Sequence, residues 1–214
     1  MKTMNIMERV SLQEIEELLL KDGEYVLPRT EDLRKFSTQE IVQFGHKHAM
    51  YTLPTVELIA WLQEEIQGLK AIEIGAGVGI IGKELGIMCT DNLMQTRPEV
   101  KAYYNMMGQP TIKYGKHVEH CDVETAVKRF LPDVVIGSWI THKFVDLFIG
   151  GNEYGPDEQV ILDHCKKYIM LGNMETHGMK PIMRKVSQVI EDCPFYVSRS
   201  VVPEKDAIFV WENI

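Results

Sequence analysis

The sequence predicts an α/β fold: a doubly wound, mostly parallel sheet with an antiparallel C-terminal strand pair, preceded by an N-terminal helical cap. From residue 70 onward, short apolar runs alternate with amphipathic helical runs, which is typical of strand–helix–strand units around a parallel sheet. The last two apolar runs are joined by a turn at residues 203–206. This turn is too short for a parallel crossover, so the final pair is expected to be antiparallel.

Residues 1–69 are expected to form the helical cap. Residues 11–14 have the pattern of a capping box and open an amphipathic helix that should end near residues 22–23. Thr38 should cap a second helix, and Pro54 should begin a third. No strand is expected before residue 70.

Residues 70–214 are expected to form the sheet domain. Strands are predicted at residues 71–74, 87–90, 117–121, 133–138 and 168–171, before a final pair at 195–198 and 207–211. Helices are predicted at residues 80–85, 100–107, 124–130, from 156 onward, and 181–190.

The composition limits the classes of partner. The 214 residues include 45% hydrophobic and 25% charged residues, as in an ordinary globular domain. Lysine and arginine number 23 against 31 aspartates and glutamates, giving a net charge of −8. This charge opposes non-specific attraction to phosphate backbones and anionic lipids, so we expect neither nucleic acid nor a membrane as the main partner.

The N-terminus and the cysteines indicate a cytoplasmic protein. The first nine residues contain no apolar signal core, and no run of about 18 apolar residues occurs. The four cysteines include no Cys-x-x-Cys pair, so we expect reduced and mostly buried thiols.

The most informative segment is a predicted strand that runs directly into Gly75, Gly77 and Gly79. Glycine there allows a tight turn and a close approach of the backbone to a ligand. Two registers compete. In the first, Gly77, Gly79 and Gly82 have the spacing of the dinucleotide fingerprint, but that fingerprint requires its first glycine directly after the strand. In the second, Gly75 has this position and is followed by Gly77, but Ile80 stands in place of the third glycine.

Acidic residues mark the same region. Glu73 lies within the strand, and Asp91 follows 18 residues later, at the end of the second predicted strand. A carboxylate at that strand end can accept hydrogen bonds from both ribose hydroxyls of a nucleoside. Asp91 therefore indicates a ligand that contains a nucleoside, but it does not indicate which such ligand binds.

The run Glu73-x-Gly75-x-Gly77-x-Gly79 resembles motif I of the class I S-adenosylmethionine-dependent methyltransferases. The resemblance implies that Glu73 interacts with the methionine end of the cofactor, directly or through water. It also implies that the glycine loop passes under the ribose and methionine, and that Asp91 binds the ribose. The expected cofactor is therefore S-adenosyl-L-methionine.

Two further cofactor contacts are implied by the resemblance. An acidic residue after the third strand, here Asp122, would face the adenine amino group, and Val123 would supply a backbone N–H or an apolar face. An aspartate directly before a predicted helix is also a preferred N-cap, so both roles stay open for Asp122.

The segment upstream of the glycine motif supplies candidates for the pocket wall. In the resembling family such a segment folds over the methionine part of the cofactor, which makes Tyr51 and His48 candidates. His46 and His48 have no further ligand at recognisable spacing, so no metal site is expected.

The fourth predicted strand ends at Ser138 and Trp139, where open α/β sheets bind ligands. We assign Ser138 to the cofactor, Trp139 to the methyl acceptor as a stacking wall, and His142 to catalysis as a general base, because histidine titrates near neutrality. The segment lacks the Asp/Asn-Pro-Pro-Tyr/Phe of the amino-methylating enzymes and the Pro-Cys of the cytosine-C5 enzymes. The resemblance therefore supports neither DNA-methylating class.

Two later segments provide second-rank candidates. The glycine-rich residues 149–157 are interpreted as a lid or a plain connection, with Asn152 and Tyr154 as the side chains of interest. Glu175 and His177 follow the fifth predicted strand, again at the ligand-binding edge.

Together these features predict an S-adenosylmethionine-dependent methyltransferase that acts on a small-molecule or protein acceptor by aligning the reactants. A dedicated base is optional in such a reaction. An NAD-binding oxidoreductase remains the alternative from the other glycine register, weakened by Glu73 and by the absence of a Tyr-x-x-x-Lys pair. A non-catalytic protein that binds S-adenosylmethionine or a partner is the third interpretation.

Overall fold

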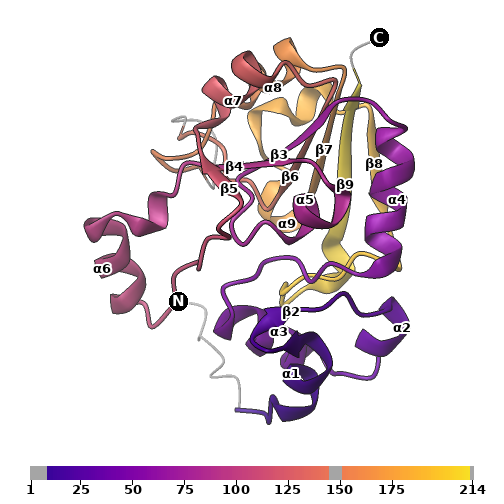
Figure 1. The fold of residues 1–214 in the computed structure, drawn as a ribbon, viewed down its shortest axis with the longest axis vertical. Coiled ribbons are helices and arrows are strands. Elements are labelled where there is room, and N and C mark those ends of the chain that lie inside the picture. Colours follow the sequence, from indigo (N-terminus) through magenta and orange to yellow (C-terminus); the bar gives the residue numbers. More distant parts are fainter. Residues whose placement is uncertain (1–8, 145–150, 213–214) are drawn as a thin grey trace.

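The computed structural model describes residues 9–144 and 151–212. A seven-stranded sheet with the order β5-β4-β3-β6-β7-β9-β8 forms its centre, with helices on both faces (Figure 1). The first five strands in this order are parallel, and β9 is antiparallel to both of its neighbours. The predicted fold class is confirmed.

The sheet consists of β3 (Ala71–Ile74), β4 (Met88–Asp91), β5 (Val118–His120), β6 (Val134–Ser138), β7 (Lys167–Asn173), β8 (Gln188–Glu191) and β9 (Asp206–Glu212). The α-helices are α1 (Gln13–Leu19), α2 (Thr30–Leu33), α3 (Thr38–Lys47), α4 (Val56–Ile66), α5 (Ile80–Leu85), α6 (Pro98–Met106), α7 (Val123–Phe130), α8 (Glu158–His164) and α9 (Met174–His177). Two short strands, β1 (Leu20–Lys21) and β2 (Glu24–Tyr25), form a separate hairpin.

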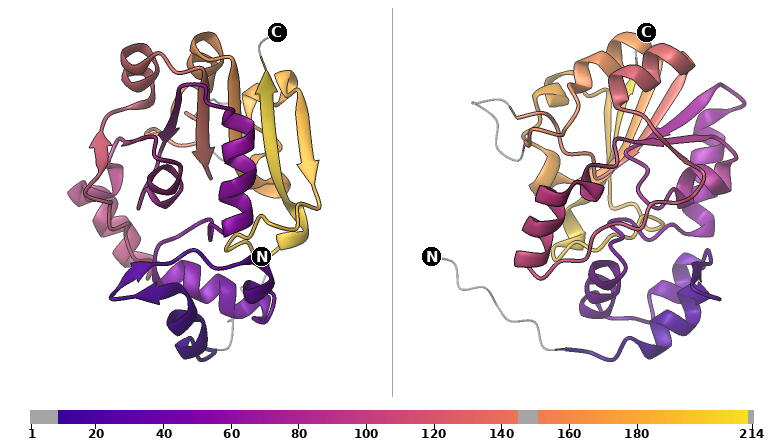
Figure 2. Two further views of the ribbon diagram at one scale, coloured as in Figure 1. Left: turned by 45° about the vertical axis from the view of Figure 1, so that its right-hand side comes forward. Right: turned by 60° about the vertical axis from the view of Figure 1, so that its left-hand side comes forward.

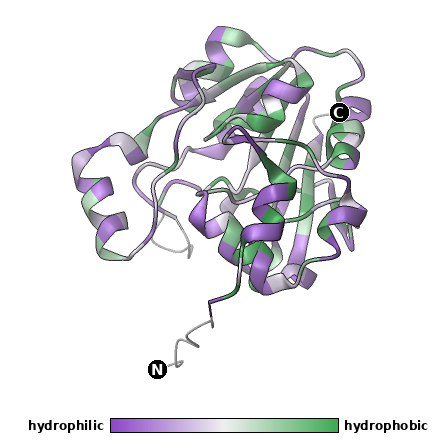
Figure 3. Ribbon diagram, turned by 60° about the horizontal axis from the view of Figure 1, so that its bottom comes forward, coloured by the Kyte–Doolittle hydropathy of each residue, from purple (hydrophilic) through white to green (hydrophobic). Residues whose placement is uncertain are grey.

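The core has one layer on each face of the sheet, because successive side chains of a strand point to opposite faces. Helices α7 and α8 pack on the face that carries Val135 and Tyr168. Helices α4 and α5 pack on the face that carries Val134 and Ile136. Figure 2 shows these helices on either side of the sheet, and Figure 3 shows hydrophobic residues along the strands.

The N-terminal helices have a core of their own. Helices α1 and α3 enclose a cluster that includes Ile15, Leu19 and Phe44. Helix α4, which the sequence assigns to the cap, packs against the sheet through Leu58 and Leu62. The division of the chain at residue 69 stays a prediction.

Helix α6 lies away from the sheet (Figure 1). Only Val100 of this helix is buried, whereas Tyr103 and Met106 are exposed. The connection between β4 and β5 therefore leaves the sheet and returns to it, and on this path it contributes to the cavity described below. No helix among the described residues is both long and apolar enough to cross a membrane.

The predicted helix caps are partly wrong. The N-cap of α1 is Leu12, without a side-chain bond, so the capping box predicted at residues 11–14 is not formed. A capping box does occur at Ser37, whose hydroxyl accepts the N–H of Glu40 while the Glu40 carboxylate accepts the N–H of Ser37. The cap of α3 is therefore one residue earlier than predicted. Helix α4 is capped by Thr55 rather than begun by Pro54.

Three predicted elements differ in kind. Residues 22–23 form the turn of the β1–β2 hairpin, because Asp-Gly favours a two-residue hairpin turn. Residues 181–190 are not one helix but a 3₁₀ turn, Pro181–Lys185, followed by β8, which pairs with β9. Residues 195–198 are not a strand of the sheet, and only Ser198 forms an isolated bridge, with Thr52. The antiparallel partners of β9 are therefore β7 and β8.

Candidate functional site

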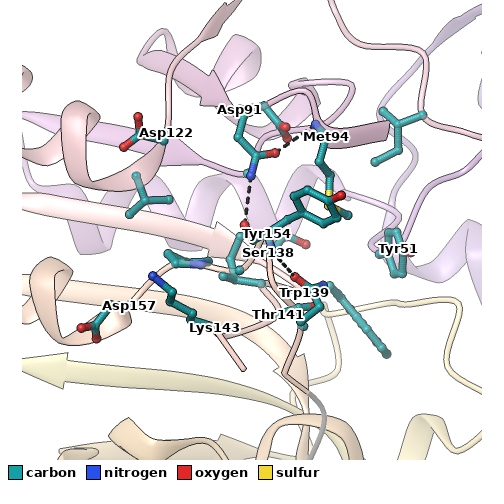
Figure 4. Close-up of a pocket in the computed structure, with 18 of the residues that line it drawn as sticks. Tyr51, Asp91, Met94, Asp122, Ser138, Trp139, Thr141, Lys143, Tyr154 and Asp157 are labelled. Atoms are coloured by element: carbon teal, nitrogen blue, oxygen red, sulfur yellow. Dashed lines mark hydrogen bonds between the residues drawn. The ribbon is translucent and has the colours of Figure 1, made fainter. Parts of the chain in front are cut away.

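A cavity of about 600 Å³ lies at the carboxyl edge of the sheet, within the range of about 300–1,000 Å³ usual for ligand sites. The strand order reverses between β3 and β6, and open α/β sheets bind ligands at such a reversal. The cavity is lined by Gly75 after β3, Asp91 at the end of β4, Asp122 after β5, and Ser138 and Trp139 at the end of β6 (Figure 4). Residues from four successive parallel strands thus meet at one place.

The connection between β4 and β5 forms a wall that the sequence analysis missed. This wall consists of Asn92, Met94, Tyr104, Ile112 and Tyr114. The segment is held by Gln95, which is 3% exposed. The side-chain oxygen of Gln95 accepts the N–H of Ile112, and its side-chain nitrogen donates to the Tyr104 hydroxyl. No local pattern marks these residues, because only the return of the segment places them beside the sheet.

The glycine loop has the register in which Gly75 directly follows β3. Gly75 has a φ of +55°, and a Cβ atom there would lie 2.5 Å from the Ile140 side chain, so no other residue fits without displacement. Gly77 also has a positive φ, and its N–H donates to Asp91. Gly75, Gly77 and Gly79 line a second, smaller cavity of about 70 Å³, which shares Gly75, Tyr51 and Ser138 with the larger one.

Gly82 packs closely against the sheet. A Cβ atom at this position would overlap the Cys89 sulfur, and the N–H of Gly82 donates to Glu73. Close helix–strand packing is the role of the third glycine in the dinucleotide fingerprint. The glycine loop alone therefore does not decide between S-adenosylmethionine and NAD as the ligand.

Asp91 is buried at the cavity edge, with 7% of its surface exposed. Its two carboxylate oxygens accept the N–H of Leu93 at 2.8 Å and of Gly77 at 3.0 Å. Burial raises the pKa of Asp91 above its ordinary value. A carboxylate has about four lone-pair sites, so each oxygen can accept one more hydrogen bond, as a pair of ribose hydroxyls requires.

Glu73 lies beneath the glycine loop and is 2% exposed. Its carboxylate accepts the Gly82 N–H at 2.8 Å, which connects β3 to α5. Burial raises the pKa of Glu73 to about 7. Glu73 is among the residues around the smaller cavity, and its interaction with the methionine end of the cofactor stays a prediction.

Asp122 has the geometry of an N-cap and also lines the cavity with Val123. Its carboxylate accepts the N–H of Thr125 at 2.9 Å, and this hydrogen bond holds the pKa of Asp122 below its ordinary value. The cap leaves the carboxylate at the cavity rim, so the cap and an adenine contact are compatible.

Two substitutions separate these roles. We expect Asp122→Ala to lower the free energy of unfolding by about 1 kcal/mol, and Asp122→Ser to restore it, because serine is also a good N-cap. If the carboxylate faces adenine, both variants should bind S-adenosylhomocysteine more weakly than the wild type in calorimetric titration. Wild-type affinity in Asp122→Ser would leave only the cap.

Aromatic side chains form a continuous wall on one side of the cavity. The Tyr51 and Trp139 rings are 5.8 Å apart, and the Trp139 and His177 rings are 5.2 Å apart and nearly perpendicular. The Trp139 indole N–H donates to the Tyr196 hydroxyl at 2.9 Å. The Arg199 guanidinium lies 3.6 Å from the centre of the Tyr51 ring. The wall is therefore fixed from behind.

Of the two residues predicted for the pocket wall, Tyr51 and His48, one lines the cavity and the other does not. Tyr51 lines the cavity, and the neighbouring Thr52 hydroxyl lies 2.8 Å from the Ser138 hydroxyl, which joins this segment to the end of β6. His48 does not line the cavity, because its ring is hydrogen-bonded to Glu16 at 2.7 Å. The placement of His48 in the pocket wall was wrong.

The structure does not bring His142 to the cavity surface. The residue is 4% exposed, and its Nε2 atom is buried without a hydrogen-bond partner among the described residues. Burial and the nearby Lys180 ammonium lower the pKa of His142. Its general-base role stays a prediction that this burial does not favour.

The second-rank candidates divide in the same way. Asn152, Tyr154 and His177 line the cavity, whereas Glu175 is exposed and does not. The predicted lid at residues 149–157 lies partly outside the described residues. Within the described parts of the chain, no group of three His, Cys, Asp or Glu side chains could hold a metal ion.

No protein-family model and no curated protein matches this chain. Among solved structures, WbdD is similar with a TM-score of 0.44 and 13% identity, over 74% of this chain and 40% of that one. A SAM-dependent methyltransferase from Agrobacterium tumefaciens has a TM-score of 0.37 and 10% identity, over 73% of this chain and 61% of that one. The 23S rRNA methyltransferase ErmE has a TM-score of 0.35 and 16% identity, over 74% and 68%.

Similarity at this level concerns the fold and carries no conclusion about activity. The fold itself, with its order reversal between β3 and β6 and its antiparallel β9, is the Rossmann-like type of the class I methyltransferases that the sequence resembles.

Proposed function

We propose that this chain is an S-adenosylmethionine-dependent methyltransferase that acts on a small-molecule or protein acceptor. The observation that carries the proposal is the environment of Asp91. Its carboxylate is held by Gly77 and Leu93, lies at the strand end expected for a ribose contact, and adjoins a cavity of about 600 Å³. Gly75 of the glycine loop lines the same cavity, so the backbone there can approach a ligand closely.

S-adenosylmethionine supplies a methyl group bound to a positively charged sulfur. In this proposal Asp91 holds the ribose, Asp122 and Val123 lie at the adenine, and Tyr51 and Ser138 lie toward the methionine part. Transfer to an acceptor requires mainly that the reacting atoms be aligned and water be excluded. The Tyr51–Trp139–His177 wall supports this part of the proposal, because its rings are fixed by packing and by the Trp139–Tyr196 hydrogen bond.

The main alternative is an NAD-binding oxidoreductase, which the close packing of Gly82 favours. Isothermal titration with S-adenosylmethionine, S-adenosylhomocysteine and NAD separates the two. We expect the first two to bind and NAD to show no binding. Binding of NAD alone would overturn the proposal.

A non-catalytic protein with the same pocket would bind the cofactor without transferring its methyl group. Incubation with methyl-labelled S-adenosylmethionine and fractionated cell extract tests this possibility. We expect label in at least one small-molecule or protein fraction. Tight cofactor binding without any transfer would favour the non-catalytic interpretation.

The ribose assignment predicts that Asp91→Asn weakens S-adenosylhomocysteine binding by about 1–3 kcal/mol, the range for an unmatched buried polar group. Asparagine keeps one acceptor oxygen for the glycine loop, so the fold should persist. Asp163→Asn is the matched control, because Asp163 is an exposed residue of α8. Calorimetric titration measures the effect, and equal affinity in both variants would contradict the assignment.

A further inference from the structure

His177 has one ring nitrogen that opens to the cavity. Its ring lines the cavity although the residue is only 3% exposed. Among the described residues, no side chain or backbone atom forms a hydrogen bond with Nε2. The buried side-chain nitrogen and oxygen atoms without a partner in that part of the chain are His142 Nε2 and Glu158 Oε2. Nε2 of His177 is therefore not sealed in the core, and its accessible side is the cavity.

The other ring nitrogen fixes the position of the proton. The backbone N–H of Asn173 donates to His177 Nδ1 at 3.0 Å. The Asn173 carbonyl oxygen also lies 3.2 Å from this nitrogen and would accept its proton in the other tautomer. Because the direction of the peptide N–H is fixed, we assign Nδ1 as its acceptor. A neutral imidazole whose Nδ1 accepts carries its proton on Nε2. His177 therefore presents an N–H donor to the cavity.

The ring stays neutral across the physiological range. Burial, the Lys180 ammonium and the neighbouring His142 lower the pKa of His177 to about 3, and together they outweigh the hydrogen bond with the Asn173 backbone, which raises it. Lys180 is itself buried and paired with Glu158 at 2.7 Å. Both Lys180 and His142 oppose a second proton on the ring.

The donor also has a fixed direction. The Trp139 and His177 rings are 5.2 Å apart and nearly perpendicular, and the backbone N–H of Trp139 donates to the Leu171 carbonyl at 2.8 Å. His177 is the last residue of the short helix α9, which directly follows β7. Two neighbouring strand ends thus hold the indole and the imidazole against each other.

We infer that His177 is a specificity-determining residue that binds the methyl acceptor by donating Nε2–H to it beside the Trp139 ring. This inference rests on the proposed methyltransferase function. The acceptor therefore presents a lone pair at this point, from an oxygen or an unprotonated nitrogen, and an ammonium group there is disfavoured. His177 binds and orients the acceptor and does not remove its proton.

The first test examines the donor directly by nitrogen-15 NMR of the histidine-labelled full chain. His177 is assigned by the loss of its signals in His177→Asn. We expect the shift pattern of a neutral ring with its proton on Nε2, unchanged between pH 8 and pH 5. A proton on Nδ1, or titration near pH 6.5, would overturn the inference whether or not the protein is a methyltransferase.

The second test uses the extract fraction that accepts label from S-adenosylmethionine. In His177→Phe, the amount of fraction needed for half-maximal transfer should rise about tenfold, as expected for one lost hydrogen bond. His177→Asn keeps an N–H donor and should recover part of the loss, and His164→Asn on α8 is the matched histidine control. The affinity for S-adenosylhomocysteine should stay within about twofold in all three variants, because none of them removes a hydrogen bond proposed for the cofactor.

The outcomes separate the two proposals. Wild-type half-saturation in His177→Phe, with cofactor binding retained, would overturn the inference and leave the methyltransferase proposal standing. No transfer by the wild-type protein to any fraction would overturn both.

Discussion

Replacement of Lys180 by methionine should lower the free energy of unfolding by about 3–5 kcal/mol, the range for breaking a buried ion pair. Lys180 and Glu158 are 2% and 3% exposed. The Lys180 ammonium donates to Glu158 and to the Ile140 carbonyl, each at 2.7 Å. Without the lysine, the Glu158 carboxylate remains buried, and among the described residues only the Tyr168 hydroxyl still donates to it. Urea unfolding at neutral pH measures the loss.

The double variant Lys180→Met with Glu158→Gln identifies the cause. Glutamine can still accept from the Tyr168 hydroxyl, so removal of the stranded charge should recover most of the lost stability. Lys166→Met is the exposed control, because the Lys166–Asp133 pair lies at the surface and should contribute little. If the double variant is as unstable as the single one, the bond to the Ile140 carbonyl accounts for the effect.

Glu73 should make the protein less stable as the pH rises from about 4.5 to about 7. Burial raises the pKa of Glu73 from 4.5 to about 7. Between these values the folded protein keeps a proton that the unfolded chain has released, so the free energy of unfolding falls with rising pH and levels off above the folded pKa. A shift of this size corresponds to about 3 kcal/mol.

The variant Glu73→Gln should abolish this contribution, because glutamine can accept the Gly82 N–H and carries no charge at any pH. Unfolding free energies at pH 5 and pH 8 should therefore differ less in Glu73→Gln than in the wild type. Comparison between the proteins is needed because Asp206, with a pKa of about 6, titrates in the same range. Equal pH dependence in both proteins would show that Glu73 is ionised throughout.

The strands that could be predicted are those whose own segment has a clear pattern in the sequence. The strand before Gly75 and the strand ending at Asp91 are apolar runs followed by turn or polar residues, and both occur as predicted to within one residue. A helix was wrongly predicted at residues 181–190 because their apolar positions recur every three or four residues. There the exposed edge of β9 was available for pairing, and tertiary contact overrode the local pattern.

The site was predictable only in part for the same reason. Asp91, Ser138 and Trp139 come at the ends of parallel strands, so topology alone places them at one edge. Tyr104 and Ile112 reach the cavity through a connection whose path depends on the buried Gln95. The sequence assigned catalysis to His142 rather than His177 because residue spacing does not reveal which of two histidines is enclosed and which opens to the cavity.

The position of Trp139 also allows ligand binding to be followed by intrinsic tryptophan fluorescence. The chain has three tryptophans. Trp211 is enclosed in the core against Tyr168, and Trp61, a residue of α4, packs against Phe195. Trp139 is the tryptophan that lines the cavity. A molecule that binds in the cavity should therefore change the fluorescence of Trp139, and intrinsic fluorescence can be used to measure the binding of candidate cofactors and acceptors. The Trp139→Phe variant is the control, because it lacks the indole that lines the cavity.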